Sequence, residues 1–143
     1  MAAKYEAEEL MNSLVPFAHT MLTRYREFYP YGGYLDRDGR IAWIGVEDPE
    51  TDHPQSQNMI ESLESTFKVM AREKKVRAVG IVCDVRVKLP DSNTKSDAIQ
   101  VSLDHIDNYS VKVFFPYSFA NNELVFGETF ACLGEQLIFG EQE

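Results

Sequence analysis

The first long segment of the sequence spaces its apolar residues as they recur on one face of an α-helix. This spacing predicts a helix from Ala3 to Glu27. Pro16 lies inside the pattern, where it removes one backbone hydrogen bond and crowds the preceding turn. We therefore expect a kink near Ser13 or a division into two shorter helices. The apolar positions are Leu10, Met11, Leu14, Val15, Ala18, Met21, Leu22, Tyr25 and Phe28.

A second helix is predicted after an acidic loop at residues 47–54. Thr51 or Asp52 is placed to cap its first turn, in which Pro54 is tolerated. The helix is expected to end in the basic stretch 72–75, because cations stabilise the C-terminal end of the helix dipole. Its apolar positions are Met59, Ile60, Leu63, Phe67, Met70 and Ala71.

Apolar and polar residues alternate in two other parts of the chain, which is the period of β-strands. Residues 34–44 contain two short apolar stretches around Asp38 and Gly39. They predict a β-hairpin, because glycine supplies the positive φ of the turn. Residues 76–87 alternate along a longer stretch and predict a strand with one face in the core.

The remainder of the chain predicts more strands, joined by turns of hairpin length. Residues 97–106 alternate again, and residues 111–115 begin a further strand that Pro116 is expected to end. Residues 124–126 and 129–139 are expected to form short strands or a hairpin. The predicted order is therefore α-β-β-α-β-β-β with a β-rich tail.

We expect residues 1–143 to form a single α+β domain. Short turns favour antiparallel pairing, which predicts one twisted antiparallel sheet. Both helices are expected to pack on one face of this sheet, giving a two-layer sandwich.

Composition narrows the classes of partner. The chain has a net charge of -9, so its field repels phosphate backbones and anionic lipids and favours a basic protein partner. Cys83 and Cys132 lie inside apolar runs, which is typical of reduced core cysteines in a cytoplasmic protein. No apolar run reaches the length of a transmembrane helix. We expect neither nucleic acid nor membrane as a partner.

The sequence contains no recognisable catalytic or cofactor motif. His19, His53 and His105 are too far apart in sequence to suggest a metal site, and we expect no metal and no cofactor. Asp104 and His105 form the most enzyme-like pair, but adjacent strand residues point to opposite faces. We therefore favour a polar turn entry over a catalytic dyad, and a protein without enzymatic activity over an enzyme.

The face of the sheet away from the helices is the candidate binding surface. If Ile81, Ile99, Val101 and Val113 face the helices, a group of polar and aromatic residues shares the opposite face. Such a face is either solvated or a partner surface. With Val82 and Phe114 exposed on it, we expect it to mediate homodimerisation. The candidate binding residues are Asp84, Arg86, Gln100, Asp104, Lys112 and Phe114, and Ser102 is expected to share their face.

Aromatic residues gather around Gly32 and Gly33. Such a cluster can line a pocket, but more often it packs a helix end onto a hairpin, and we favour the packing role. The cluster consists of Tyr25, Phe28, Tyr29, Tyr31, Tyr34 and Trp43.

Three stretches of the chain, 28–39, 97–105 and 115–117, resemble a group of small uncharacterised bacterial proteins. This resemblance implies no established activity or site residue. In size, acidity and architecture the chain is also similar to the immunity proteins that neutralise bacterial toxins, which is an analogy and not a motif match.

Two functions remain open at this point. The first is a non-enzymatic protein-interaction module of the bacterial cytoplasm, with an immunity-type inhibitor of a basic toxin as one form. The alternative is a small hydrolase or ligand-binding enzyme that uses Asp84, Asp104 or His105 in a pocket on the open sheet face.

Overall fold

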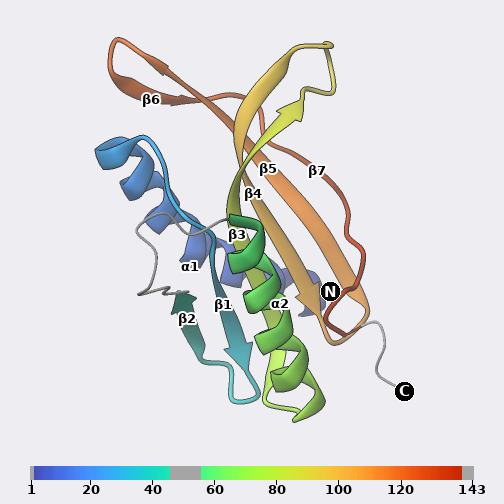
Figure 1. Ribbon diagram of the computed structural model, residues 1–143. Coiled ribbons are helices and arrows are strands. Elements are labelled where there is room, and N and C mark those ends of the chain that lie inside the picture. Colours follow the sequence, from blue (N-terminus) through green and yellow to red (C-terminus); the bar gives the residue numbers. More distant parts are fainter. Residues whose placement is uncertain (1, 46–55, 140–143) are drawn as a thin grey trace.

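The computed structural model describes residues 2–45 and 56–139 (Figure 1). Within these residues, two helices and seven strands follow one another in the predicted α-β-β-α-β-β-β order with two more short strands. The expected cap of the second helix at Thr51 or Asp52, with Pro54, lies outside the described residues. The elements are α1 (Ala2–Tyr25), β1 (Tyr31–Asp36), β2 (Ile41–Gly45), α2 (Ser56–Arg72), β3 (Val76–Lys88), β4 (Lys95–His105), β5 (Tyr109–Ala120), β6 (Glu123–Phe126) and β7 (Phe130–Leu133).

All strands belong to one antiparallel sheet, in the order β2-β1-β3-β4-β5-β6, and β7 pairs with β5 as well. This confirms the α+β class and the single antiparallel sheet. Gly39 has a φ of +87° in the β1–β2 turn, as the hairpin prediction requires. Asn121 and Asn122, with φ of 53° and 66°, make the two-residue turn between β5 and β6.

The two helices lie on opposite faces of the sheet, which corrects the expectation that both pack on one face. In Figure 1, α2 lies in front of the sheet and α1 behind it. A Cβ added to Gly33 would meet Leu14 of α1, whereas one added to its neighbour Gly32 would meet Phe67 of α2. The reason is that β3 is buried on both faces over its first half, so each face needs its own cover. We call the two sides of the sheet the α1 face and the α2 face.

Helix α1 covers the larger apolar cluster of the molecule. Its buried residues are spaced by three or four positions, so they form the stripe that the sequence predicted. A Cβ added to Gly80 would lie 2.9 Å from a side-chain methyl of Leu14, so glycine at position 80 lets α1 approach the sheet closely. The cluster combines Ala7, Leu10, Leu14, Ala18 and Leu22 of α1 with Tyr31, Leu35, Ala78, Val82, Ile99, Val101, Leu103 and others.

Helix α1 is one continuous helix, and the side chain of Tyr31 enters its backbone ladder near Pro16. The Tyr31 hydroxyl donates a hydrogen bond to the carbonyl oxygen of Leu14 (2.5 Å) and accepts one from the N–H of Ala18 (3.1 Å). The hydroxyl thus lies between the carbonyl oxygen of Leu14 and the N–H of Ala18, which bond directly to each other in a regular α-helix. The aromatic cluster therefore contributes to the core through Phe28 and Tyr31, which are buried.

Helix α2 covers a smaller cluster on the other face, above β1 and β3. Phe67 is fully buried at its centre. Ile138, near the end of the described chain, completes this cluster. Neither described helix combines the length and the apolar character that a membrane-spanning helix needs.

Strand β5 continues through Pro116 to Ala120, which corrects the expectation that Pro116 ends it. Strands β6 and β7 pair with successive parts of the same edge of β5, and residues 127–129 between them interrupt the pairing opposite Pro116. Pro116 has no N–H to offer this edge, although its carbonyl oxygen still accepts a hydrogen bond from Gly127 (2.8 Å). The proline therefore breaks the neighbouring strand instead of its own.

Candidate functional site

A groove lies on the α2 face between α2 and the end of the described chain. Its volume is about 120 Å³. The floor is formed by β3, β4 and β5, one wall by Ile60 and Glu64 of α2, and the other wall by residues 134–138. The floor residues are Val79, Ile81, Cys83, Gln100, Ser102, Leu103, Asp104, Ser110, Val111 and Lys112.

Strand register decides which side chains reach this groove. Paired residues of neighbouring strands lie on the same face, and β3 pairs Cys83 with Gln100 while β4 pairs Ser102 with Lys112. Gln100, Asp104, Lys112 and Phe114 therefore share the α2 face, as predicted. They are not on a helix-free face, because α2 covers part of it.

Asp84 and Arg86 lie on the α1 face, which corrects their predicted grouping with Gln100 and Lys112. Asp84 pairs with Ile99, a member of the α1 cluster. The Tyr117 hydroxyl donates a hydrogen bond to Asp84 (2.7 Å), and Arg86 forms an ion pair with Asp97 (3.3 Å). Burial, together with the charges of Asp97 and Glu27, raises the pKa of Asp84, although the Tyr117 hydrogen bond opposes the rise.

The 134–139 segment is held over the sheet by the buried carboxylate of Asp104. The Ser110 hydroxyl donates to one oxygen of Asp104, and the N–H of Ile138 donates to the other (2.9 Å). The N–H of Gln136 donates in turn to the Ser110 hydroxyl (3.2 Å). Gly134 permits this turn, because a Cβ there would lie 2.1 Å from the Ser110 hydroxyl oxygen. Asp104 therefore builds one wall of the groove.

His105 points to the other face, as the strand alternation predicted. Its side chain is fully buried, and its Nε2 lies 2.6 Å from a carboxylate oxygen of Glu6 in α1. Its Nδ1 accepts a hydrogen bond from the N–H of Asp107 (3.0 Å), which places the ring proton on Nε2. The second oxygen of Glu6 bonds to Arg77. Both ring nitrogens are thus occupied, and His105 ties α1 to the sheet.

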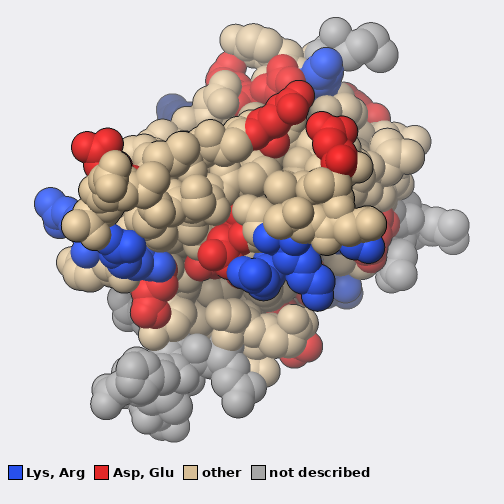
Figure 2. Space-filling view, turned by 90° about the horizontal axis from the view of Figure 1, so that it is seen from above, with Lys and Arg blue, Asp and Glu red and all other residues tan. Residues whose placement is uncertain are grey.

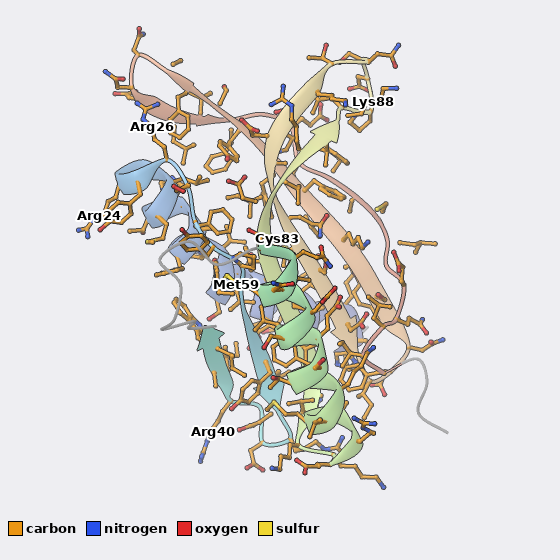
Figure 3. The ribbon with its side chains drawn as sticks, in the orientation of Figure 1. Arg24, Arg26, Arg40, Met59, Cys83 and Lys88 are labelled. Atoms are coloured by element: carbon orange, nitrogen blue, oxygen red, sulfur yellow. The ribbon has the colours of Figure 1, made fainter. Side chains whose placement is uncertain are left out.

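The polar groups of the groove are largely paired with one another. Gln100 donates through Nε2 to the Ser102 hydroxyl (3.2 Å), and Lys112 forms an ion pair with Glu135 (3.2 Å) at the groove's edge. Burial raises the pKa of the Cys83 thiol to about 11, with Asp84 adding to the rise and Lys112 opposing it. At neutral pH the thiol is therefore protonated and a poor nucleophile. Figure 3 labels Cys83 on β3.

The groups named for the alternative hydrolase do not converge. Asp104 lies on the α2 face, whereas His105 and Asp84 lie on the α1 face. Among the residues that the structure describes, no three His, Cys, Asp or Glu side chains are grouped so that they could hold a metal ion. The groove is lined mainly by apolar residues and is therefore suited to binding an apolar group. The Ser110 hydroxyl and the Asp104 carboxylate that line it already accept hydrogen bonds from the N–H groups of Gln136 and Ile138.

The expected exposure of the sheet face is also corrected. Val82 is fully buried under α1, and Phe114 is 8% exposed and stacks on Phe130 with 4.9 Å between ring centroids. The two apolar residues on which we based homodimerisation are therefore buried. Ile60, Glu64 and the 134–138 wall were not predicted as site residues; the only signal in the sequence is the apolar pair Leu137 and Ile138 after Gly134.

No family model matches the chain, and neither the curated proteins nor the solved structures contain a match to it.

Proposed function

We propose that the protein is a non-enzymatic binding module whose α2-face groove receives an apolar side chain of a partner protein. The observation that supports this proposal is a preformed groove of about 120 Å³ with Ile60, Ile81 and Leu137 among its lining residues. A cavity of roughly 150 Å³ accommodates one benzene molecule, so the groove has the size of a single side chain. Pockets that take one anchor side chain contribute most of the affinity at many protein interfaces.

The partner in this proposal is basic. The chain carries a net charge of -9, and Glu64 and Glu135 flank the groove. Such a field accelerates encounters with cationic surfaces and slows those with anionic ones. A cytoplasmic immunity-type protein that neutralises a basic bacterial toxin is the specific form of this proposal.

Two exposed leucines on the chain allow a matched test. Leu137 lines the groove and is 42% exposed, whereas Leu133 is 89% exposed and lies outside it. Leu137→Gln removes an apolar contact without adding charge, so we expect it to weaken the partner complex at least about tenfold, or roughly 1.4 kcal/mol. Leu133→Gln should leave the dissociation constant within about twofold, because it makes the same change outside the groove.

The dissociation constant is measured by calorimetry with the purified partner, after circular dichroism has shown that both variants are folded. Association rates at low and high salt test the charge argument, because exposed charges are screened beyond about 8 Å at physiological ionic strength. Equal loss of binding in both leucine variants, or an association rate that is indifferent to salt, would contradict the proposal.

A small-ligand site is the second candidate function, and Lys112 is the observation that favours it. Its ammonium group lies at the edge of the groove with a partly exposed side chain, where it could pair with an anionic ligand. A carboxylate compound that binds the protein, and whose binding Lys112→Met abolishes while Leu137→Gln leaves the protein partner bound, would replace the protein-binding proposal.

Homodimerisation stays a prediction. Sedimentation velocity at tens of micromolar measures it directly. A dimer that dissociates in the Leu137→Gln variant but not in the Leu133→Gln variant would make a second copy of the chain the occupant of the groove.

A further inference from the structure

A second pocket, which we call the Pro116 pocket, lies at the other end of the same sheet face. Its volume is about 300 Å³. Lys88, labelled in Figure 3, marks the hairpin between β3 and β4 that forms one side of it. Residues 89–92 line that side, Pro116 forms the floor, and residues 127–130 line the opposite side.

The walls of the Pro116 pocket are held in place by local hydrogen bonds and stacking. Leu89 donates its N–H to the carbonyl oxygen of Thr94 (2.9 Å), which closes the hairpin loop. Across the pocket, Gly127 donates to the carbonyl oxygen of Pro116 (2.8 Å), and the ring of Phe130 stacks on Phe114. The pocket is therefore formed before any ligand arrives.

Two carboxylates flank these apolar walls. Asp91 comes from the β3–β4 connection and Glu128 from the β6–β7 connection, and both residues are exposed. Within residues 2–45 and 56–139, neither forms an ion pair with a lysine or arginine. Seen from above, at the end that holds the hairpin tips, several acidic side chains lie beside basic ones, and uncharged surface separates these charged groups from one another (Figure 2).

We infer that the Pro116 pocket receives an arginine side chain of the basic partner, an inference that rests on the proposed function. Arginine combines an apolar stem, which suits walls of Leu89, Pro90 and Pro116, with a planar cation that stacks on aromatic rings such as Phe130. Its guanidinium offers several donors in a fixed plane and can satisfy carboxylates that approach from two loops, here Asp91 and Glu128.

The two pockets set a spacing on the partner. Lys112 borders the groove and Pro116 borders the second pocket, and both side chains lie on the α2 face of β5. Four residues of a strand span about 13 Å. The matching partner surface therefore presents an apolar side chain and an arginine about 13 Å apart, which is the reach of four extended residues.

The test uses N-acetyl-arginine-methylamide as a probe and nuclear magnetic resonance of the isotope-labelled full chain. We expect the probe to shift the amide signals of residues 89–94 and 127–130 with a millimolar dissociation constant. N-acetyl-norleucine-methylamide, which has the stem without the charge, should bind at least about fivefold more weakly. Shifts spread over the whole surface, or centred elsewhere, would overturn the inference.

A double variant, Asp91→Asn with Glu128→Gln, should weaken binding of the arginine probe about fivefold or more, because it removes both charge-assisted contacts. The matched control is Asp38→Asn with Glu8→Gln, which changes the net charge equally at two exposed positions away from the pocket. Equal effects of the two double variants would show that only the overall charge matters, and would also overturn the inference.

The outcome is separable from that of the proposed function. The probe experiment needs no partner protein, so the Pro116 pocket is tested even if Leu137→Gln fails to affect any protein complex. Conversely, a partner that depends on Leu137 but binds the Asp91→Asn, Glu128→Gln variant unchanged would support the groove and reject the arginine pocket.

Discussion

The two faces of the sheet are built by the same strands but are closed in different ways. On the α1 face, one 24-residue helix covers the central strands with five buried residues on one stripe. Its polar contacts are internal: Tyr31 bonds within the helix ladder, and Glu6 pairs with both His105 and Arg77.

On the α2 face, a helix of 17 residues packs mainly on β1 and β3. Strands β4 and β5 are covered by other parts of the chain. The 134–139 segment provides part of that cover, and it is attached through Asp104 and Ser110. Between helix and segment the groove remains, and Leu137 is 42% exposed at its side.

If the α2-face groove binds a partner as we propose, this difference separates stability from binding in the molecule. A face closed by a continuous helix contributes mainly to the global free energy of unfolding, whereas a face closed by a short segment opens at lower cost. Binding surfaces are drawn from such less stable regions. We therefore expect substitutions on the two faces to differ first in stability and then in binding.

The largest expected effect is on the α1 face. Leu14 is fully buried and fills the space that a Cβ at Gly33 or Gly80 would need, so Leu14→Ala should cost about 3 kcal/mol of unfolding free energy. Leu137→Ala on the α2 face should cost less than about 1 kcal/mol, because Leu137 is 42% exposed. Urea denaturation measures both. Equal losses of unfolding free energy in the two variants would contradict the comparison, because the α2 face would then be as firmly closed as the α1 face.

Tyr31→Phe should lower the free energy of unfolding by about 2 kcal/mol, because it removes two hydrogen bonds of a buried hydroxyl beside Pro16. The control is Tyr25→Phe, which removes a hydroxyl that is attached to a 61% exposed side chain and should change stability by less than about 0.5 kcal/mol. If Tyr31→Phe is as mild as its control, the helix closes its own ladder and the hydroxyl is not needed there.

Asp104→Asn should cost about 1.5 kcal/mol and act locally. Ser110 and Ile138 donate to different oxygens of Asp104, and asparagine replaces one of these oxygens by an NH₂ group, so one of the two donors loses its acceptor. Amide hydrogen exchange should then accelerate at Gln136 and Ile138 while the α1 core stays protected. Asp107→Asn is the control, because the Asp107 side chain is 70% exposed. Faster exchange throughout the protein would show that Asp104 supports the whole fold.

Local patterns predicted the elements, because each is decided by neighbours in sequence. The spacing of Leu10, Leu14 and Ala18 is sufficient to define the buried stripe of α1, and the Asp38-Gly39 turn is sufficient to define the first hairpin. The order of elements and the antiparallel sheet follow from these signals and from the short turns between them.

The faces could not be predicted in the same way. In β3, Ala78 and Val82 face α1 while Val79 and Ile81 face α2, so the pattern does not distinguish a core face from a solvent face. A shift of one residue in register exchanges the two faces of a strand. For that reason Asp84 and Arg86 were grouped with residues of the opposite face.

The groove was beyond sequence reasoning for another reason. One wall depends on a contact between Asp104 and Ile138, which are 34 residues apart in the chain. No spacing rule connects a strand residue to a later irregular segment. The acidic character and the polar residues Gln100 and Lys112 were visible in the sequence, but the cavity that joins them to Leu137 was not.

Cys83 reports how well the α2 face excludes water. Its pKa rises from 9.0 to about 11 through burial, so between these values the unfolded chain binds fewer protons than the folded protein. Stability should therefore fall as pH rises, with Cys83 contributing about 1 kcal/mol between pH 9 and 10. The Cys83→Ala variant should show a correspondingly smaller fall in urea denaturation. Cys132→Ala, which changes an exposed cysteine, should keep the full pH dependence.

The smallest expected effect on stability concerns Asp84 on the α1 face. Burial and the nearby acids Asp97 and Glu27 raise the pKa of Asp84. A raised pKa means that the folded protein disfavours the ionised form of the acid more than the unfolded chain does. At neutral pH the charge of such an acid therefore opposes folding. Asp84→Asn should therefore stabilise the protein at pH 7, by less than about 1 kcal/mol because the residue is only partly buried and solvent screens its charge.

The gain from Asp84→Asn should disappear near pH 3, where Asp84 is protonated in the folded wild type and largely protonated in the unfolded chain. Asp38→Asn serves as the control, because it neutralises an exposed acid in the β1–β2 turn. Denaturation curves at the two pH values give the comparison. A loss of stability at pH 7 would mean that the hydrogen bond from Tyr117 to ionised Asp84 outweighs burial and repulsion, so that the charged form of Asp84 stabilises the fold.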